Sequence, residues 1–505
     1  CINKDGTMNE LAGKYEGMKL EEARKAIIED LKREGLLIKQ EDLKQTVGCC
    51  WRCETPVEFL PTEQWFIRTL AHKEKMIELG RKIKWYPEYY RKRYEDWVRN
   101  LKWDWCISRQ RYYGVPFPVW YCKDCGRIVV AKEEDLPVDP RLEGYRCECG
   151  SENLEPEEDV MDTWMTSSLT PQITTKWVED REFFEKMFPM SLRPQAHDII
   201  RTWAFYTILK AYLHENSIPW ENIMISGYVY VDKGMAMSSS KGIGESPEKV
   251  IERDGADVLR YWATCAGVGE DLIYREKDIT RGKKIIIKLW NASRFAETHL
   301  KDYKREKAEL KIEDKWILSE LYRVIEEAES GYKNFNPNKA KRAIENFFKN
   351  VFCDFYLEMI KHRLYGNDEE SKKAAKFTLY QCLLAILKMY APIIPFITEE
   401  IYQELFREHE GDISIHVSKW PEKGEVDEKS LKLGRMATEI ISAIRQWKTQ
   451  RSMPMSAEVE KVVIESKEDL KEIEEVVKGT MKVKEIEYGK VSEGTDIGFA
   501  KVEIR

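Results

Sequence analysis

The sequence predicts a multidomain protein with an α/β part, an all-α part and a small α+β appendage. With 505 residues, the chain exceeds what one compact core usually holds, so we expect three or more domains. Up to about residue 270, short apolar strings that suit strands alternate with glycine turns and helical patterns. From about residue 271 to 420 the pattern becomes long helices with few glycines, and a further helix with alternating strands follows.

The composition is that of an ordinary globular protein with a formal net charge of −7. Any contact with nucleic acid must therefore come from local basic patches. No apolar run approaches the length of a membrane span and no secretory signal is visible, so we expect a cytoplasmic protein. The 12 cysteines favour reduced thiols and metal sites over a disulfide framework. Because the chain begins at Cys1, we expect a fragment or a processed product.

The first hundred residues hold one ambiguous segment. Asp5-Gly6 predicts a turn, and Lys19 to Leu37 carry the apolar pattern of a helix. Between Trp85 and Arg111 aromatic and basic residues are densely mixed. These side chains either stack on and pair with single-stranded RNA or form a core face with solvated lysines, which is the commoner outcome. The residues concerned are Tyr89, Tyr90, Arg91, Lys92, Arg93 and Trp97.

Two pairs of cysteines about twenty residues apart predict a structural zinc ribbon over residues 121–152. Thiolates at such turns complete a tetrahedral Zn²⁺ shell, and the neighbouring glycines let backbone amides approach the sulfurs. The predicted ligands are Cys122, Cys125, Cys147 and Cys149. A catalytic metal is not expected, because no histidine or carboxylate pattern leaves an open coordination position.

A second cysteine pair, Cys50 and Cys53, is half of another knuckle, with Cys49 as a possible substitute. An unoccupied half-site is the favoured interpretation, because a metal held there needs ligands from elsewhere.

Two polar strings follow the ribbon. Asp162, His197 and Asp198 lie next to apolar strings, a pattern common at the ends of strands in α/β folds. Taken singly, each is more often a helix cap or a satisfied buried group than a site residue. Trp164 and Trp203 alone would be interpreted as core aromatics. We expect His197 to lie beside a site without a catalytic role.

The loop from Gly227 to Gly242 predicts a phosphate-binding element. Val229 to Val231 suit a short strand and Asp232 to Gly234 a tight turn, before three serines and Lys241. Small hydroxyl residues and glycines let the backbone approach phosphates, and Lys241 supplies a positive charge. The alternative is a polar surface loop. A helical pattern from Ser246 to Trp262 follows, with Ser246 as the natural N-cap and Pro247 in the first turn.

This loop resembles the Lys-Met-Ser-Lys-Ser-Lys-Gly loop of class I aminoacyl-tRNA synthetases, with Ala236 and Ser239 in place of the first two lysines. The resemblance implies ATP, accompanied by Mg²⁺, as a substrate. It implies that Met237, Ser238, Ser240 and Lys241 bind ATP, and that Lys241 stabilises charge during catalysis together with the serines Ser238, Ser239 and Ser240.

Further strings resemble the valine/isoleucine/leucine subgroup of this family, in the order found in valyl-tRNA synthetases of archaeal type. Trp105-Cys-Ile-Ser-Arg-Gln110 resembles the re-entry into the catalytic sheet. The resemblance implies five parts: the remnant of an inserted editing domain (1–47), a return connection with the half knuckle (48–105), the second half of a Rossmann-type catalytic domain (106–270), a helical anticodon-binding domain (271–422), and the α+β appendage (423–505).

The same resemblance assigns the amino-acid pocket. Asp162-Thr-Trp164 and Asp198 to Trp203 are similar to the elements whose tryptophans wall the valine side chain, and the Asp198 position contacts the adenylate. The implied partners are valine, ATP and tRNA(Val), and the implied state is a monomer.

No His-x-Gly-His string occurs in the sequence, so we expect a C-terminal portion that alone activates valine poorly or not at all. Two alternatives stay open: part of an isoleucine–tRNA ligase, and a tRNA-binding fragment without catalysis.

Overall fold

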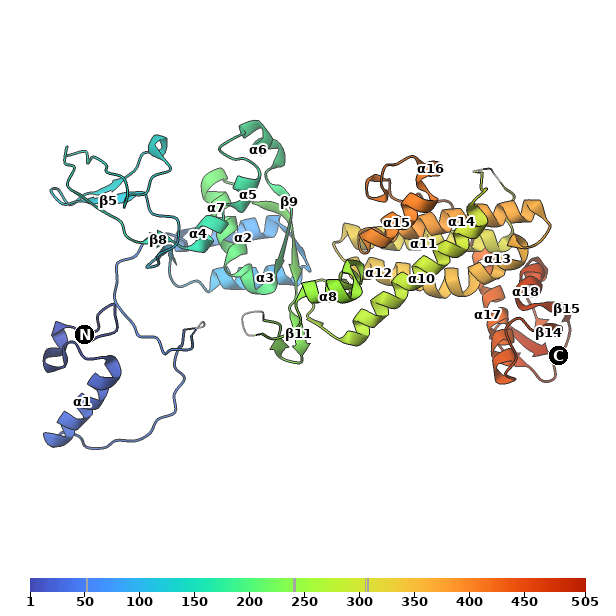
Figure 1. Ribbon diagram of the computed structural model, residues 1–505, viewed down its shortest axis with the longest axis horizontal. Coiled ribbons are helices and arrows are strands. Elements are labelled where there is room, and N and C mark those ends of the chain that lie inside the picture. Colours follow the sequence, from blue (N-terminus) through green and yellow to red (C-terminus); the bar gives the residue numbers. More distant parts are fainter. Residues whose placement is uncertain (51–52, 239–241, 305, 307) are drawn as a thin grey trace. The chain divides into compact units, whose positions relative to one another are not determined.

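The computed structural model describes residues 1–50, 53–238, 242–304, 306 and 308–505 (Figure 1). They form two compact units, residues 1–72 with 101–166 and residues 73–100 with 167–505. Among the described residues, no helix is both long and apolar enough to cross a membrane.

The first unit consists of one helix and several short strands. Helix α1 spans Leu20–Arg33, within the predicted helical segment. Asp104 helps to join the two stretches of chain, because its Oδ1 accepts hydrogen bonds from the backbone N–H groups of Thr69 (2.9 Å) and Leu70 (3.0 Å). The antiparallel pairs are β1 (Phe66–Ile67) with β3 (Trp105–Cys106), and β4 (Ser108–Arg109) with β8 (Val160–Met161).

The predicted cysteine ribbon is the remaining sheet of this unit, and its order is β6-β5-β7. The central strand β5 pairs antiparallel with both neighbours, and its Trp120 is buried against the ring of Tyr145, 4.7 Å away. The strands are β5 (Val119–Cys122), β6 (Ile128–Val130) and β7 (Leu154–Pro156), and the short 3₁₀ turns of the unit are η1 (Glu10–Tyr15), η2 (Leu70–His72) and η3 (Glu133–Asp135).

The second unit contains a parallel sheet of order β2-β10-β9. Helix α3 buries Tyr90, Tyr94 and Val98, so the core-face interpretation holds for Tyr90, while Tyr89 is exposed. The elements are α2 (Lys73–Lys82), β2 (Lys84–Tyr86), α3 (Tyr89–Arg99), α5 (Thr170–Thr174), α6 (Arg181–Met187), β9 (Met190–Ala196), η4 (His197–Ile200), α7 (Trp203–Glu215) and β10 (Trp220–Ser226). Helix α4 (Thr163–Ser167) joins the two units in sequence.

A second small sheet follows β10, with order β12-β11-β13. Its strands are β11 (Val229–Asp232), β12 (Met235–Ala236) and β13 (Leu272–Ile273). The helical pattern predicted as one segment is two helices, α8 (Pro247–Asp254) and α9 (Ala256–Ala263), because Gly255 at φ 95° breaks it. Glycine is favoured at such a positive φ, so a single residue of the sequence accounts for the break between the two helices. Ser246 occupies the N-cap of α8, but its side chain makes no capping hydrogen bond.

Helix α9 binds the ends of two bundle segments. The carboxylate of Asp257 accepts hydrogen bonds from the backbone N–H groups of Phe396 (3.2 Å) and Ile397 (2.7 Å), at the start of α15. Arg260 donates to the carbonyls of Ile393 and Pro392, both at 3.0 Å. A negative charge at a helix N-terminus is stabilising, because the N–H groups there have no partner inside the helix.

The remaining helices form a bundle around one large core (Figure 1). Helix α11 packs against α12, α14 and α17, and α10 packs against α9, α14 and α15. The bounds are α10 (Glu276–Leu300), α11 (Ile312–Lys333), α12 (Pro337–Asn346), the π-helical η6 (Phe347–Tyr356), α13 (Leu357–Leu364), α14 (Glu369–Tyr390), α15 (Pro395–Leu405), α16 (Arg407–Glu410), η7 (Ile415–Val417) and α17 (Glu428–Gln450).

The α+β appendage has a sheet of order β15-β14-β17-β16. Its helix α18 packs on α13 and α17. Lys448 of α17 is buried, and its Nζ donates to the carbonyls of Met455 (3.0 Å), Ala457 (2.6 Å) and Met481 (2.9 Å), which ties this part to the bundle. The elements are β14 (Val459–Ser466), η8 (Lys471–Ile473), α18 (Glu474–Met481), β15 (Val483–Tyr488), β16 (Thr495–Asp496) and β17 (Ala500–Ile504).

Candidate functional site

The carboxyl end of β9 leads to Asp198 and Trp203, and the carboxyl end of β10 leads towards the serine-rich loop. Strand β9 runs directly into η4, which begins with His197 and Asp198, and β10 runs into Gly227 and β11. Because the two strands are parallel and adjacent, these segments leave the sheet at the same edge. In open α/β sheets, ligands bind at this edge.

His197 lies in a cluster of aromatic and charged side chains. Its ring stacks on Tyr90 (centroids 6.0 Å apart) and meets the edge of Tyr228 (4.5 Å). Nδ1 is 3.3 Å from Nη1 of Arg93, and Nε2 is 3.7 Å from a carboxylate oxygen of Asp271. These contacts hold the ring in place, and the absence of a catalytic role for His197 stays a prediction.

Asp198 faces Tyr228 of the same region. Burial raises the pKa of Tyr228, and a hydrogen bond to Asp198 raises it further, so the phenol stays a donor to that carboxylate. The backbone N–H of Tyr228 donates to Asp271 Oδ1 at 2.8 Å. Asp198 is therefore held by a neutral donor and stays available as an acceptor for a ligand hydroxyl.

Trp203 begins α7 and is fixed on two sides. Its Nε1 donates to the carbonyl of Ser167 at 3.1 Å, and the guanidinium carbon of Arg193 lies 3.0 Å from the ring centroid. This stacking is a cation–π contact. Burial lowers the pKa of Arg193 to about 10. The indole is consequently a rigid wall with one face covered by a cation.

The sequence interpretation missed Arg193 and Gln195. Among the described residues, Arg193 Nε and Gln195 Oε1 are buried without a hydrogen-bond partner. Both stand in strand β9, just before Asp198. Polar residues near the carboxyl end of a parallel strand were the available signal, because such strands otherwise read as continuous hydrophobic runs.

Trp164 and Asp162 belong to the first unit. Asp162 is buried, and its Oδ2 lies 3.3 Å from Nη2 of Arg109. Trp164 follows in α4 and is half-buried. Since Trp203 belongs to the second unit, the convergence of the two tryptophans stays a prediction.

The serine-rich loop begins as a hairpin. The backbone N–H of Met237 donates to Val229 at 2.8 Å, and Ser238 and Ile243 exchange two backbone hydrogen bonds of 3.0 and 2.9 Å. A Cβ added at Gly227 would lie 2.3 Å from the carbonyl oxygen of Glu270, so the hairpin starts from a close backbone contact. Three of the predicted residues, Ser239, Ser240 and Lys241, lie outside the described residues.

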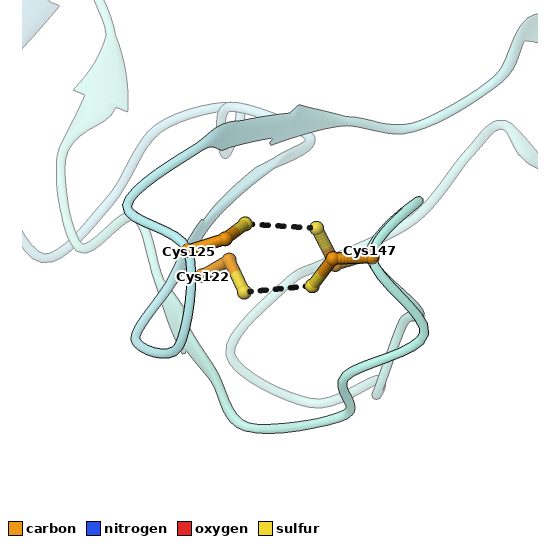
Figure 2. A group of neighbouring side chains, drawn as sticks. Cys122, Cys125 and Cys147 are labelled. Carbon is orange, nitrogen blue, oxygen red and sulfur yellow. Dashed lines mark hydrogen bonds between the residues drawn. The ribbon is translucent and has the colours of Figure 1, made fainter.

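The four predicted ribbon cysteines lie together (Figure 2). Their sulfur atoms are all within 4.8 Å of one another, and the pairs Cys122–Cys149 and Cys125–Cys147 are separated by 3.7 and 3.6 Å. A tetrahedral ion with metal–sulfur bonds of about 2.3 Å requires sulfur–sulfur edges of about 3.8 Å. The cluster can therefore hold a metal ion of the size of zinc.

The electrostatics of the cluster favour a cation. Backbone hydrogen bonds, the strongest from Cys125, lower the pKa of the Cys122 thiol to about 6. At Cys125 the backbone N–H of Arg127 acts in the same direction, but burial and the neighbouring thiols outweigh it and raise the pKa to about 12. Four adjacent sulfurs cannot all ionise without a positive ion to balance them.

Cys50 and Cys53 have no comparable set of partners. Among the described residues, the ribbon is the only group of three or more potential metal ligands. The Cys53 thiol instead contacts Thr55 Oγ1 at 3.3 Å, and that contact lowers its pKa.

Residues 10–275 match the family of class I tRNA synthetases (I, L, M and V), and residues 314–464 match the anticodon-binding domain of tRNA ligases. Since the first match spans more than half of the chain, the chain belongs to the class I tRNA synthetases of this group.

Similar curated proteins include the valine–tRNA ligases of Methanocaldococcus jannaschii (43% identity, 96% of this chain), Pyrococcus furiosus (45%, 97%) and Methanopyrus kandleri (42%, 100%). The chain spans 56%, 57% and 55% of their lengths, respectively.

Two solved structures share the fold. Mycobacterium tuberculosis methionyl-tRNA synthetase in complex with methionyl-adenylate has a TM-score of 0.56 at 17% identity, over 74% of this chain and 70% of its own. The ternary complex of Agrobacterium radiobacter K84 LeuRS with tRNA and LeuAMS has a TM-score of 0.54 at 19% identity, over 65% of this chain and 43% of its own.

Proposed function

We propose that this chain takes part in the reaction of a valine–tRNA ligase, in which ATP activates valine and the valyl group passes to tRNA(Val). The observation that carries the proposal is the identity of 42–45% to the three named valine–tRNA ligases over nearly the whole chain. The rigid indole of Trp203 beside the end of β9 supports it.

In the proposed site, Trp203 and Trp164 form the walls of a slot for the valine side chain. Trp203 is suited to this role because two contacts immobilise it, and a rigid apolar slot excludes a larger side chain by shape. Such a slot discriminates only weakly against a side chain of the same shape that carries a hydroxyl. The weak discrimination of valine enzymes against threonine is the standard example. Asp198 accepts a hydrogen bond from the adenylate end of the intermediate.

A carboxylate oxygen of valine attacks the α-phosphorus of ATP, and pyrophosphate leaves with the electron pair of the broken P–O bond. This step needs positioning and charge stabilisation rather than a protein nucleophile. We assign the stabilisation of the triphosphate to the loop that contains Met237, Ser238, Ser239, Ser240 and Lys241. Mg²⁺ bound with ATP supplies further positive charge.

The ribbon cysteines, in this proposal, hold one structural zinc ion. Zinc fits because the donor set is four sulfurs at tetrahedral spacing, which leaves no open coordination position for catalysis. The monomeric state and the cytoplasmic location stay predictions from the sequence.

Pyrophosphate exchange tests the proposal without tRNA. Because the chain spans little more than half of its relatives, it is assayed alone and mixed with the part of the Methanocaldococcus jannaschii relative that it does not match. We expect valine to support exchange by the mixture at least about tenfold better than isoleucine, since one excess methylene is worth roughly that factor. Trp203→Ala should raise the KM for valine, whereas Trp290→Ala, an exposed tryptophan of α10, should not.

Equal use of valine and isoleucine by the mixture would contradict the assignment of valine. An unchanged KM in Trp203→Ala would remove Trp203 from the proposed slot.

A further inference from the structure

A cysteine and a lysine lie together where the segment after α9 meets α12. Lys341 Nζ donates a hydrogen bond to Cys265 Sγ at 2.8 Å, although the two residues are 76 positions apart in the sequence. Lys341 belongs to α12, and Cys265 follows shortly after the end of α9. Neither residue takes part in the proposed reaction, so the proposed function leaves this pair unexplained.

The ammonium group of Lys341 is buried without a carboxylate. The residue is only 4% exposed, and among the described residues it forms no ion pair with a carboxylate. Its Nζ lies 4.4 Å from the centroid of the Tyr261 ring. Glu345, one turn further along α12, instead binds Arg281 at 2.7 Å and accepts from the Tyr261 hydroxyl. Because a buried charge needs a partner, the Cys265 sulfur and the Tyr261 ring are the groups that stabilise this ammonium.

The backbone around Cys265 is fixed by the same helix. Asn338 Nδ2 donates to the carbonyls of Thr264 and Cys265, both at 2.8 Å. Asn338 is buried and lies on α12, one turn before Lys341. The Cys265 thiol also contacts the carbonyl of Tyr261 at 3.6 Å. These contacts hold the sulfur and the lysine nitrogen at bonding distance from each other's reactive atoms, which favours reaction between them.

The pair is open to small molecules. Cys265 is half-buried, and it lines a cavity of about 340 Å³ together with Lys341. The cavity has more cations than carboxylates, since Asp278 and Glu345 face Arg275, Arg281, Lys341 and Arg342. Partly exposed cysteines among cations are the ones that react as thiolates.

A metal site does not explain the pair. Among the described residues, only the ribbon cysteines form a group of three or more potential metal ligands. A thiolate beside an ammonium group is suited instead to two-electron oxidation by a peroxide, because sulfur supplies the electrons and the ammonium supplies a proton to the leaving group.

We infer that hydrogen peroxide converts Cys265 and Lys341 into a reversible sulfenamide cross-link. First, the Cys265 thiolate attacks one oxygen of the peroxide and the O–O bond breaks. The leaving hydroxide takes a proton from the Lys341 ammonium and becomes water, so sulfur is oxidised by two electrons to a sulfenic acid and the peroxide is reduced. Next, the neutral amine attacks the sulfenic sulfur and the S–O bond breaks. The hydroxyl leaves with an amine proton as a second water, and an S–N bond remains.

The cross-link attaches the end of α9 covalently to α12. A thiol reductant reverses it: one thiol attacks the sulfur and releases the amine, and a second thiol then releases Cys265 as a thiol while the reductant becomes a disulfide. The inference is independent of the proposed function, because the chemistry involves neither ATP, valine nor tRNA.

The test treats the full chain with hydrogen peroxide and maps its tryptic peptides by mass spectrometry. Trypsin releases Cys265 within residues 261–275 and, when Lys341 is blocked, that lysine within residues 340–342. We expect these two peptides joined, with their combined mass lower by two hydrogen atoms, and separated again by dithiothreitol. Cys265→Ser and Lys341→Arg should lose the joined peptide. The control Lys339→Arg, which makes the same change at an exposed lysine of α12, should keep it.

Trapping of the sulfenic acid with dimedone checks the second step. An amine held in contact reaches an effective molarity of about 10⁵ M or more, which exceeds any concentration of dimedone in solution. Labelling of Cys265 in the unmodified chain and in Lys339→Arg should therefore stay below about a tenth of that in Lys341→Arg.

The joined peptide of the unmodified chain decides the matter even if a variant folds poorly. Its absence after peroxide treatment would overturn the inference, as would a disulfide or a sulfinic acid at Cys265 in place of the S–N bond. Persistence of the joined peptide in Lys341→Arg, or equal dimedone labelling in all three chains, would overturn it as well.

Discussion

The cysteine ribbon and the helical bundle are built around different kinds of core. In the ribbon, three strands of three or four residues surround four clustered sulfurs, with Trp120 as its main buried aromatic. In the bundle, long helices bury a continuous core that runs from α9 to the appendage. The bundle even buries an ion cluster, in which Arg363 binds Glu313 and Asp314 at side-chain exposures of 5% or less.

The difference shows how the size of a core sets what a fold can tolerate. A small ribbon buries too little apolar area to offset chain entropy, and the zinc ion proposed for its four cysteines would supply the missing free energy. A large bundle has enough apolar burial to accommodate desolvated charges, provided that each charge is paired. The following experiments separate these two sources of stability, from the largest expected effect to the smallest.

Removal of the metal should affect the ribbon most. Structural zinc contributes an apparent ~10–16 kcal/mol to folding in small zinc domains, so Cys147→Ser or a chelator should unfold residues 119–156. Metal analysis should give one zinc per chain in the unmodified protein and in the control Cys1→Ser, whose cysteine is exposed. Amide hydrogen exchange should become faster in the ribbon and should stay unchanged in α11. A ribbon that stays protected without metal would refute this explanation.

Removal of one partner from the buried ion cluster should destabilise the bundle. Arg363→Met leaves the carboxylates of Glu313 and Asp314 buried without their cation, which costs about 3–5 kcal/mol. The measurement is the free energy of opening from hydrogen exchange of α11 amides.

The matched control is Arg323→Met, which removes an exposed ion pair with Glu428 on the same bundle. Such pairs contribute about 0–1 kcal/mol, so similar losses in the two variants would show that burial is not the cause.

Glu313→Gln should change the pH dependence of bundle stability. Burial, and then the charge of Asp314, raise the pKa of Glu313 to about 7. The folded state therefore binds this proton more tightly than the unfolded state. Its contribution to the free energy of unfolding is fully present below the unfolded pKa of about 4.3 and is lost as the pH rises through 7.

Relative to the unmodified protein, the free energy of unfolding of the Gln variant should thus rise by roughly 1–3 kcal/mol between pH 5 and pH 8. Glu326→Gln, at an exposed carboxylate, serves as the control. Its difference in free energy of unfolding from the unmodified protein should not change with pH. A flat difference for Glu313→Gln as well would show that its carboxylate is ionised throughout.

Local patterns predicted most of the fold. The further helix expected after residue 420 is α17, which begins at Glu428 because Asp427 caps it by accepting from the backbone N–H of Ser430 at 3.0 Å. That cap was readable in the sequence, since aspartate favours this position. The break at Gly255 was missed because a helical hydrophobic period continues across it.

The candidate site was only partly predictable. Spacing identified the cysteine cluster, because ligands close in sequence must come together at knuckle turns. The contact of His197 with Arg93 joins residues 104 positions apart, and the stacking of Arg193 on Trp203 joins a strand to the helix that follows η4. No periodicity encodes such contacts, since they depend on the packing of α3 and α7 against the sheet.

Helix α9 connects the sheet part of the second unit with the helical bundle. Asp257 and Arg260 bind the start of α15 and the carbonyls that precede it, so α9 is attached to the bundle by side chains as well as by the continuous chain. A displacement of the bundle is therefore expected to carry α9 with it.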